Sequence, residues 1–225
     1  MEKVLHIVLV ILISLSVSPI VSAQGIEVNQ VKFVFTINEK PLNLNESTFS
    51  TYLGDTISID KLKFYISFDL SSQKDQSYFL IDASIPTSLT HQISSAKNLN
   101  ELSFNLGVDS ITNSSGAKGG DLDPMHGMYW SWQSGYINFK LEGSYLANGD
   151  KKKFTYHLGG YNGAFDSLQS VNLESETESH SYTISMSIDK LVGQFDYRNT
   201  RNLMSPSLDA VRLSKIVAKS FYLVN

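Results

Sequence analysis

The segment ISIDKLKFYISFDL, residues 57–70, decides the fold that we expect for this chain. Apolar residues alternate with polar ones along much of it, and it is rich in β-branched and aromatic side chains, which is the pattern of a half-buried β-strand. The same pattern predicts further strands, separated by turn residues such as Asn148-Gly149-Asp150. These strands are expected over residues 26–37, 77–81, 100–108, 128–141, 153–158 and 181–188.

One segment near the C-terminus has a helical pattern instead. Leu213, Ile216 and Val217 follow helical spacing after Ser205-Pro206-Ser207, which is a suitable helix start, and the chain then ends in the strand-like Phe221–Val224. The sequence therefore predicts an all-β fold. We expect a single antiparallel β-sandwich of about seven or eight strands with one short C-terminal helix.

The first residues have the pattern of a secretory leader. The apolar run 4–17 is followed by Val21-Ser22-Ala23, whose small side chains suit a signal peptidase. The run is too short for a membrane anchor and is broken at Pro19. We therefore expect a signal peptide over residues 1–23 and one domain over residues 24–225, periplasmic or secreted and without a stable membrane anchor.

Composition excludes several classes of function. The chain contains no cysteine, which rules out disulfides, thiolate metal sites and cysteine nucleophiles. Its formal net charge is −4 and no basic stripe is visible, so nucleic acid is not an expected partner. The one basic run, Lys151-Lys152-Lys153, follows a turn and is expected at an exposed hairpin tip.

The residues that could carry chemistry lie in two segments. DLDPMHGMYWSWQSGY, residues 121–136, holds both tryptophans and His126, while FTYHLGG, residues 154–160, holds His157. Two separated imidazoles beside a tryptophan pair favour a copper or other transition-metal site. The turn at 148–150 should pair the flanking strands as a hairpin and bring His157 beside the strand that leads back to Trp132.

Other interpretations of the same residues stay open at this point. Trp130 and Trp132 could fill a core, as large aromatic residues usually do, and His157 could be a buried neutral histidine bonded to a carbonyl group. His91 and His180 look like exposed loop residues. The long segment 109–127 is expected to be a functional loop. Its oxygen-bearing side chains could hold calcium, although their spacing matches no EF-hand; they are Asp109, Asn113, Asp121 and Asp123.

Several motifs together resemble the MbnP-like copper-binding proteins, and the most specific of them is the Trp-x-Trp-x-x-Gly-Tyr block. The motifs are residues 41–44, 62–67, 105–110, 122–124, 127–136 and 157–160. This resemblance implies an exported β-rich protein associated with copper handling and, in methanotrophs, with methanobactin. Related surface copper proteins bind the metal through two histidines and a tryptophan oxidised to kynurenine. In those proteins a dihaem enzyme of the cytochrome c peroxidase type performs the oxidation.

We therefore expect an exported copper-binding protein that is not itself an enzyme. The expected metal ligands are His126 and His157, with Trp130 or Trp132 as the precursor of an oxidised ligand. Trp132 is favoured for the oxidation because the hairpin argument places it nearer His157. Expected partners are a dihaem cytochrome c peroxidase-type protein and a metal-uptake receptor. The alternative is an envelope interaction or adhesion β-sandwich module stabilised by calcium. A weaker alternative is a hydrolase that uses Asp109 or Asp123 with a histidine.

Overall fold

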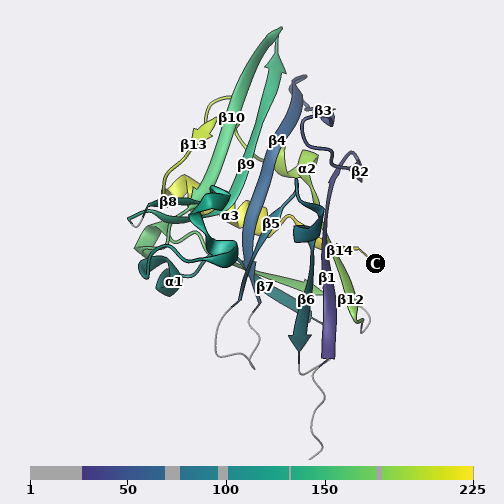
Figure 1. The fold of residues 1–225 in the computed structure, drawn as a ribbon. Coiled ribbons are helices and arrows are strands. Elements are labelled where there is room, and N and C mark those ends of the chain that lie inside the picture. The colour runs from purple at the N-terminus through teal and green to yellow at the C-terminus, as the bar shows by residue number, and fades with distance from the viewer. Residues whose placement is uncertain (1–26, 69–76, 96–100, 132, 176–178, 225) are drawn as a thin grey trace, which may run out of the picture.

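The computed structural model describes residues 27–68, 77–95, 101–131, 133–175 and 179–224, so the expected leader lies outside the described residues. Two sheets dominate these residues (Figure 1). The smaller contains β1 (Glu27–Ile37), β2 (Lys40–Pro41), β6 (Thr90–Ser95), β12 (Ser181–Ser187) and β14 (Phe221–Val224). The larger contains β3 (Thr48–Ser50), β4 (Thr56–Ser67), β5 (Tyr78–Asp82), β7 (Glu101–Leu106), β8 (Tyr129–Ser131), β9 (Gly135–Ala147), β10 (Asp150–Gly159), β11 (Gln169–Glu174) and β13 (Asn202–Leu203).

Helices are short and lie between or beside the strands. The α-helices of the described residues are α1 (Ser110–Ser114), α2 (Ile188–Val192) and α3 (Leu208–Ala218). Single turns of 3-10 helix occur at η1 (Pro86–Leu89), η2 (Gly120–Leu122), η3 (Pro124–His126) and η4 (Gly163–Phe165). Among the described residues, no helix is long and apolar enough to cross a membrane.

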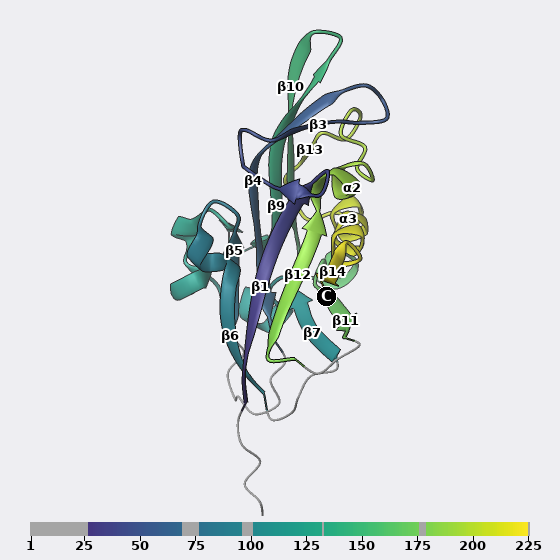
Figure 2. The ribbon, with the colours of Figure 1, turned by 90° about the vertical axis from the view of Figure 1, so that its right-hand side faces the viewer.

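The prediction of a mostly β chain is confirmed, but the prediction of a purely antiparallel sandwich of seven or eight strands with one helix is wrong. The described residues form fourteen strands and three α-helices, and both sheets are mixed. β1 pairs with β12 in parallel, as β10 does with β13. Figure 2 shows β1 and β12 side by side. Parallel partners need a long connection, and local alternation carries no signal for the direction in which two distant strands pair.

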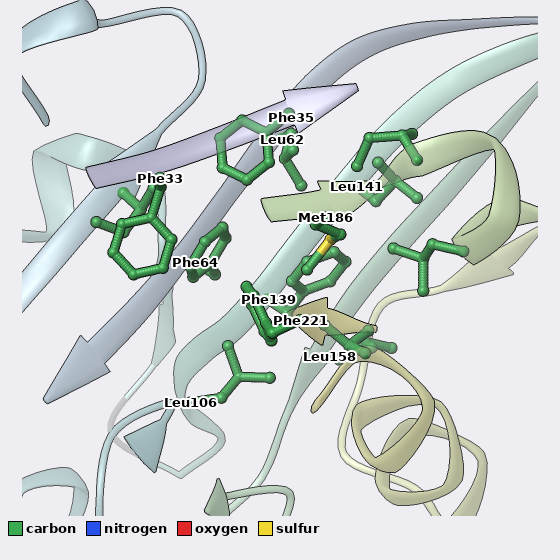
Figure 3. Packing of buried hydrophobic residues seen from close by; sticks show 14 of the residues in the cluster. Phe33, Phe35, Leu62, Phe64, Leu106, Phe139, Leu141, Leu158, Met186 and Phe221 are labelled. Atoms are coloured by element: carbon green, nitrogen blue, oxygen red, sulfur yellow. The ribbon is translucent and has the colours of Figure 1, made fainter. Parts of the chain in front are cut away.

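One aromatic core joins the two sheets. Phe64 of β4 contacts Phe33 and Phe35 of β1 edge-to-face, with ring centroids 5.7 and 5.9 Å apart. It also contacts Phe139 of β9 and Phe221 of β14. Figure 3 shows these rings gathered between strands of both sheets. The alternation in β4 therefore fixes which of its faces points into this core.

The β9–β10 hairpin forms at the predicted turn. Asn148 and Gly149 both have positive φ, 51° and 85°, which is the backbone of a type I′ turn and explains the Asn-Gly pair. The two strands pair in register so that His157 faces Lys140. Residues 151–153 are exposed at the hairpin, as predicted.

The predicted strand over residues 128–141 is split in two. β8 turns back and pairs with β9, with Tyr129 opposite Tyr136. Together with the segment before it, β8 covers a second apolar cluster separate from the main core, and Trp130 packs against that cluster. Figure 2 places the short teal helices of this segment on one side of the fold and α3 on the other. The segment 109–127 is thus a structured cover, not an open loop.

The C-terminal helix and strand are confirmed. The Ser207 hydroxyl accepts a hydrogen bond from the Ala210 amide and caps α3, which buries Ala210, Leu213 and Val217. β14 follows at once and pairs with β12.

Candidate metal site

A row of charged residues crosses the outward face of the larger sheet. Asp82 of β5, Lys63 of β4, Lys140 of β9 and His157 of β10 are successive register partners. Lys63 pairs with Asp82 at 2.8 Å. The apolar residues that alternate with this row point to the main core, because successive side chains of a strand point to opposite faces. The alternation of side chains along each strand therefore places these polar side chains on one face of the sheet, although they come from four separate strands.

His157 is buried and its ring is held from one side. Only 6% of the residue is exposed, and its Nε2 lies 2.8 Å from Oε1 of Glu142. Glu142 also forms an ion pair with Lys61, whose Nζ lies 2.9 Å from Oε2 of Glu142. A carboxylate can only accept, so Nε2 carries the hydrogen of a neutral His157 and Nδ1 carries the lone pair. Nδ1 is buried and has no hydrogen-bond partner in the part of the chain that the structure describes.

The environment keeps this imidazole neutral. Burial lowers the pKa of His157 below its ordinary value, and the hydrogen bond to Glu142 opposes this effect without cancelling it. For Glu142, burial alone would raise the pKa, but the hydrogen bonds from His157 and Lys61 outweigh burial and lower it. The result is a neutral imidazole with a fixed tautomer, held by an ionised carboxylate.

Trp130 lies against the backbone that follows His157. A Cβ atom at Gly159 would lie 2.8 Å from Trp130 Cζ3 and 2.5 Å from the Tyr136 carbonyl oxygen, so the indole rests on a position that only glycine can occupy. The glycine at this position thus permits close approach of the indole to the backbone. The indole Nε1 is buried and, like His157 Nδ1, has no hydrogen-bond partner within the described ranges.

His126 lies at the end of η3, above the charged row. Its side chain is exposed, and its Nε2 is 3.1 Å from the carbonyl oxygen of Gly120. Because a carbonyl oxygen accepts, Nε2 is the donor of this hydrogen bond. The backbone carbonyl of His126 lies 3.5 Å from Lys63 Nζ, and that of Gly127 accepts from Lys140 Nζ.

The structure thus brings the turn of His126, the indole of Trp130 and the buried ring of His157 to one region of the larger sheet. Trp132 lies outside the described residues. No group of three or more histidine, aspartate or glutamate side chains in the described ranges is arranged to hold a metal ion.

The four oxygen-bearing residues that suggested calcium are engaged in building the cover. Asp109 caps α1 at the Thr112 amide, Asn113 accepts from the Tyr136 amide, Asp121 accepts from the Leu80 amide, and Asp123 accepts from the Met125 amide. Each makes a hydrogen bond that fixes the backbone of the segment, and this explains their presence without a cation.

His91 differs from its expected place. It lies in β6, not in a loop, is only partly exposed, and stacks on Phe79 with ring centroids 4.5 Å apart. Its Nε2 lies 2.8 Å from the Ser88 carbonyl oxygen. The strand was missed because polar residues dominate this segment. His180 is exposed, as predicted.

Sequence reasoning missed Glu142, Lys140 and Lys63 as parts of the site. The signal was present in INFKLEG, residues 137–143, where Lys140 and Glu142 alternate with buried Phe139 and Leu141. Charged residues at every second position of a strand share a face. Which side chain on the next strand they meet depends on register, and the turn at 148–150 predicted only that its flanking strands pair.

The described residues define a class of protein: a mostly β fold of two mixed sheets that carries a buried histidine beside a tryptophan on the outward face of the larger sheet. The MbnP family model matches residues 27–205, so the chain belongs to the MbnP family. The structure of MbnP from Methylosinus trichosporium is similar, with a TM-score of 0.57 and 13% sequence identity over 83% of this chain and 87% of that one. At this identity the similarity shows the fold. No curated protein matches the sequence.

Proposed function

We propose that this protein binds one copper ion at His157, with His126 as a second nitrogen ligand and Trp130 beside them. The observation that carries the proposal is the buried Nδ1 of His157, which has no hydrogen-bond partner among the described residues. A buried polar atom without a partner costs free energy, and native proteins rarely leave one unmatched. A metal ion on this lone pair would satisfy it.

The residues present fit a nitrogen-liganded metal. Glu142 bonds Nε2 on the far side of the ring, which is the carboxylate–histidine arrangement that orients metal-binding imidazoles and raises their basicity. The imidazole is neutral, as a ligand must be. Thiolate ligands are excluded by the absence of cysteine. Nitrogen ligands suit copper, which also stands highest in the divalent affinity series.

Trp130 needs a chemical change before it could ligate a metal. An indole nitrogen carries a hydrogen and only donates. Oxidative opening of the indole to kynurenine exchanges one ring carbon for one oxygen and leaves an aromatic amine with a lone pair. We propose Trp130 for this modification because its ring lies on Gly159, two residues after His157. The oxidant would be supplied by a partner of the dihaem peroxidase type.

The proposed role is that of an exported copper carrier and not of an enzyme. The leader over residues 1–23 would be removed, giving a periplasmic or secreted protein that could pass metal to an uptake receptor. Mass spectrometry of protein from the native host tests export: the mature chain should begin at Gln24. A membrane-bound product that keeps the leader would contradict it.

Copper titration tests the site. Purified chain, titrated with Cu(I) and Cu(II) against a competing chelator, should bind one copper per molecule. His157→Ala should abolish binding and His126→Ala should weaken it, while the exposed His180→Ala serves as control. If the His157 and His126 variants both bind as tightly as the parent, the proposed site is wrong.

Peptide mapping after coexpression with a dihaem peroxidase should place the oxidation at Trp130.

A further inference from the structure

Lys140 is a buried lysine without an ion-pair partner among the described residues. Only 8% of it is exposed, although lysine is almost never buried unless it is paired. Its register partners are Lys63 and His157, neither of which offers a negative charge. The nearest carboxylate on its own strand, Glu142, is already bonded to Lys61 and His157.

Burying an ammonium group costs free energy that its contacts must offset. Burial disfavours the charged form of Lys140 and so lowers its pKa. Simple packing would be served better by an uncharged side chain of the same length, such as methionine. We therefore expect the ammonium group to make an interaction that an uncharged side chain could not make.

The acceptor of Lys140 is the backbone of the His126 turn. Its Nζ donates to the carbonyl oxygen of Gly127, the residue that ends η3 with a left-handed φ of 69°. Lys63 Nζ lies 3.5 Å from the adjacent carbonyl, that of His126. Carbonyl groups at a helical C-terminus lack partners within the helix, and cations there are favourable.

The flanks of this turn are held by other groups. Tyr65 donates its hydroxyl to the carbonyl of Asp121, and Tyr136 donates to that of Leu122. On the other flank the Ile137 amide donates to the carbonyl of Met128. Removing the Lys140 ammonium should therefore free the middle of the turn without detaching the whole segment.

We propose that Lys140 is a positioning residue that fixes the His126 turn against the strand carrying His157 and so sets the placement of the two proposed copper ligands. This role rests on the proposed function, because it describes how that site is assembled. Lys140 acts through the Gly127 carbonyl and not as a ligand. Lys63 assists from the next strand.

A double-mutant cycle with Cu(I) tests this role. Lys140→Met, which keeps the length of the side chain and removes the donor, should weaken copper binding about tenfold, as losses around metal ligands do. In the His126→Ala background the same change should cost nothing further, because the residue it positions is gone. Lys153→Met, on the exposed part of β10, is the matched control. An equal loss in both backgrounds would overturn the proposal.

Hydrogen exchange on the copper-free chain separates this role from the proposed function. The amides of His126 and Gly127 bond to the carbonyls of Asp123 and Pro124. They should exchange faster in Lys140→Met, while the β9–β10 amides keep their protection. Lys140→Arg, which retains a donor, should behave like the parent.

Unchanged exchange in Lys140→Met would refute the positioning role, whether or not copper binds. A parent protein that binds no copper would refute the proposed function alone, since exchange still decides the role of Lys140. If Lys140→Met does not fold, hydrogen exchange is measured on Lys63→Met in its place. Unchanged exchange at His126 and Gly127 in that variant would count against the proposed role of Lys140 and Lys63.

Discussion

At Gly159 the absence of a side chain lets Trp130 lie beside His157. The strand could accept alanine at this position without backbone strain, so the requirement is purely one of space. Gly159 and Trp130 also show which features of the site could be predicted from the sequence. A glycine inside a strand often marks a close approach of the backbone, but the approach of Trp130 to Gly159 depends on the turn at β8, and no local pattern predicts that turn.

Gly159→Ala should therefore disturb the site more than the fold. The new methyl group would meet the Tyr136 carbonyl at 2.5 Å and the Trp130 ring at 2.8 Å. We expect a loss of about 1–3 kcal/mol in the free energy of unfolding, as overpacking usually causes, together with weaker copper binding. Gly119→Ala, where a Cβ meets nothing within 4 Å, is the control. Parent-like tryptophan fluorescence and copper affinity in Gly159→Ala would contradict this account.

Asp55 forms the main buried ion pair away from the site. Its carboxylate receives both Nε and Nη2 of Arg198 at 2.7 Å, and the Tyr197 hydroxyl at 3.0 Å. The Arg198 hydrogen bond lowers the pKa of Asp55, and burial opposes it without cancelling it. A carboxyl group whose pKa is lowered in the fold stabilises the protein above its unfolded pKa of about 3.9.

The stability that Asp55 contributes should accordingly be lost in acid. At neutral pH Asp55→Asn should melt several degrees below the parent. The difference should shrink as the pH falls from about 5 towards 2, because the parent carboxyl becomes protonated. Thermal melts followed by circular dichroism measure this, with the exposed Asp150→Asn as control. A gap between parent and variant that does not depend on pH would count against the ion pair.

At the scale of elements, alternation and turn chemistry predicted most of the long strands and the β9–β10 hairpin. β1, β4, β10 and β12 lie where the alternation of apolar and polar residues predicted them, and the Asn-Gly turn predicted the pairing of β9 with β10. β6 and β11 were missed because their sequences, THQISS and QSVNLE, are largely polar. Their places are set by pairing with β1 and β7, which is a tertiary effect.

The cap of α3 offers an element-scale test. The Ser207 hydroxyl satisfies the Ala210 amide, which would otherwise lack a partner at the start of the helix. Ser207→Ala should lower the free energy of unfolding by about 1 kcal/mol. The neighbouring exposed Ser205→Ala should leave it unchanged. Urea denaturation of the two variants gives the comparison, and equal effects would show that the cap contributes nothing.

At the scale of the whole molecule, two mixed sheets share an aromatic core whose centre is Phe64. The sequence predicted a mostly β chain because its strand signals are local. It did not predict the parallel pairing of β1 with β12, since that depends on strands far apart in the chain. Lys63 and Asp82 join the charged row through such long-range pairing. Lys140 and Glu142 lie beside His157 in the β9–β10 hairpin, but the turn at 148–150 predicted that these strands pair and not their exact register.

Phe64→Ala tests how strongly the two sheets depend on this core. The ring is fully buried and contacts aromatic residues of both sheets. The variant should lose about 3–5 kcal/mol in the free energy of unfolding, through lost burial and the remaining cavity. Phe165→Ala, at a residue 44% exposed, should cost far less. Similar losses at the two positions would mean that Phe64 is not central to the core.

The central claim is that His157 offers Nδ1 to copper while Nε2 stays bonded to Glu142. Nitrogen-15 NMR of histidine-labelled protein measures both atoms, and Cu(I), which is diamagnetic, leaves the signals observable. In the copper-free chain, His157 should show the neutral Nε2–H tautomer. One equivalent of Cu(I) should shift the Nδ1 signal and leave the Nε2–H proton in place. An Nδ1 signal that does not move, or a shift at Nε2 with loss of its proton, would contradict the account.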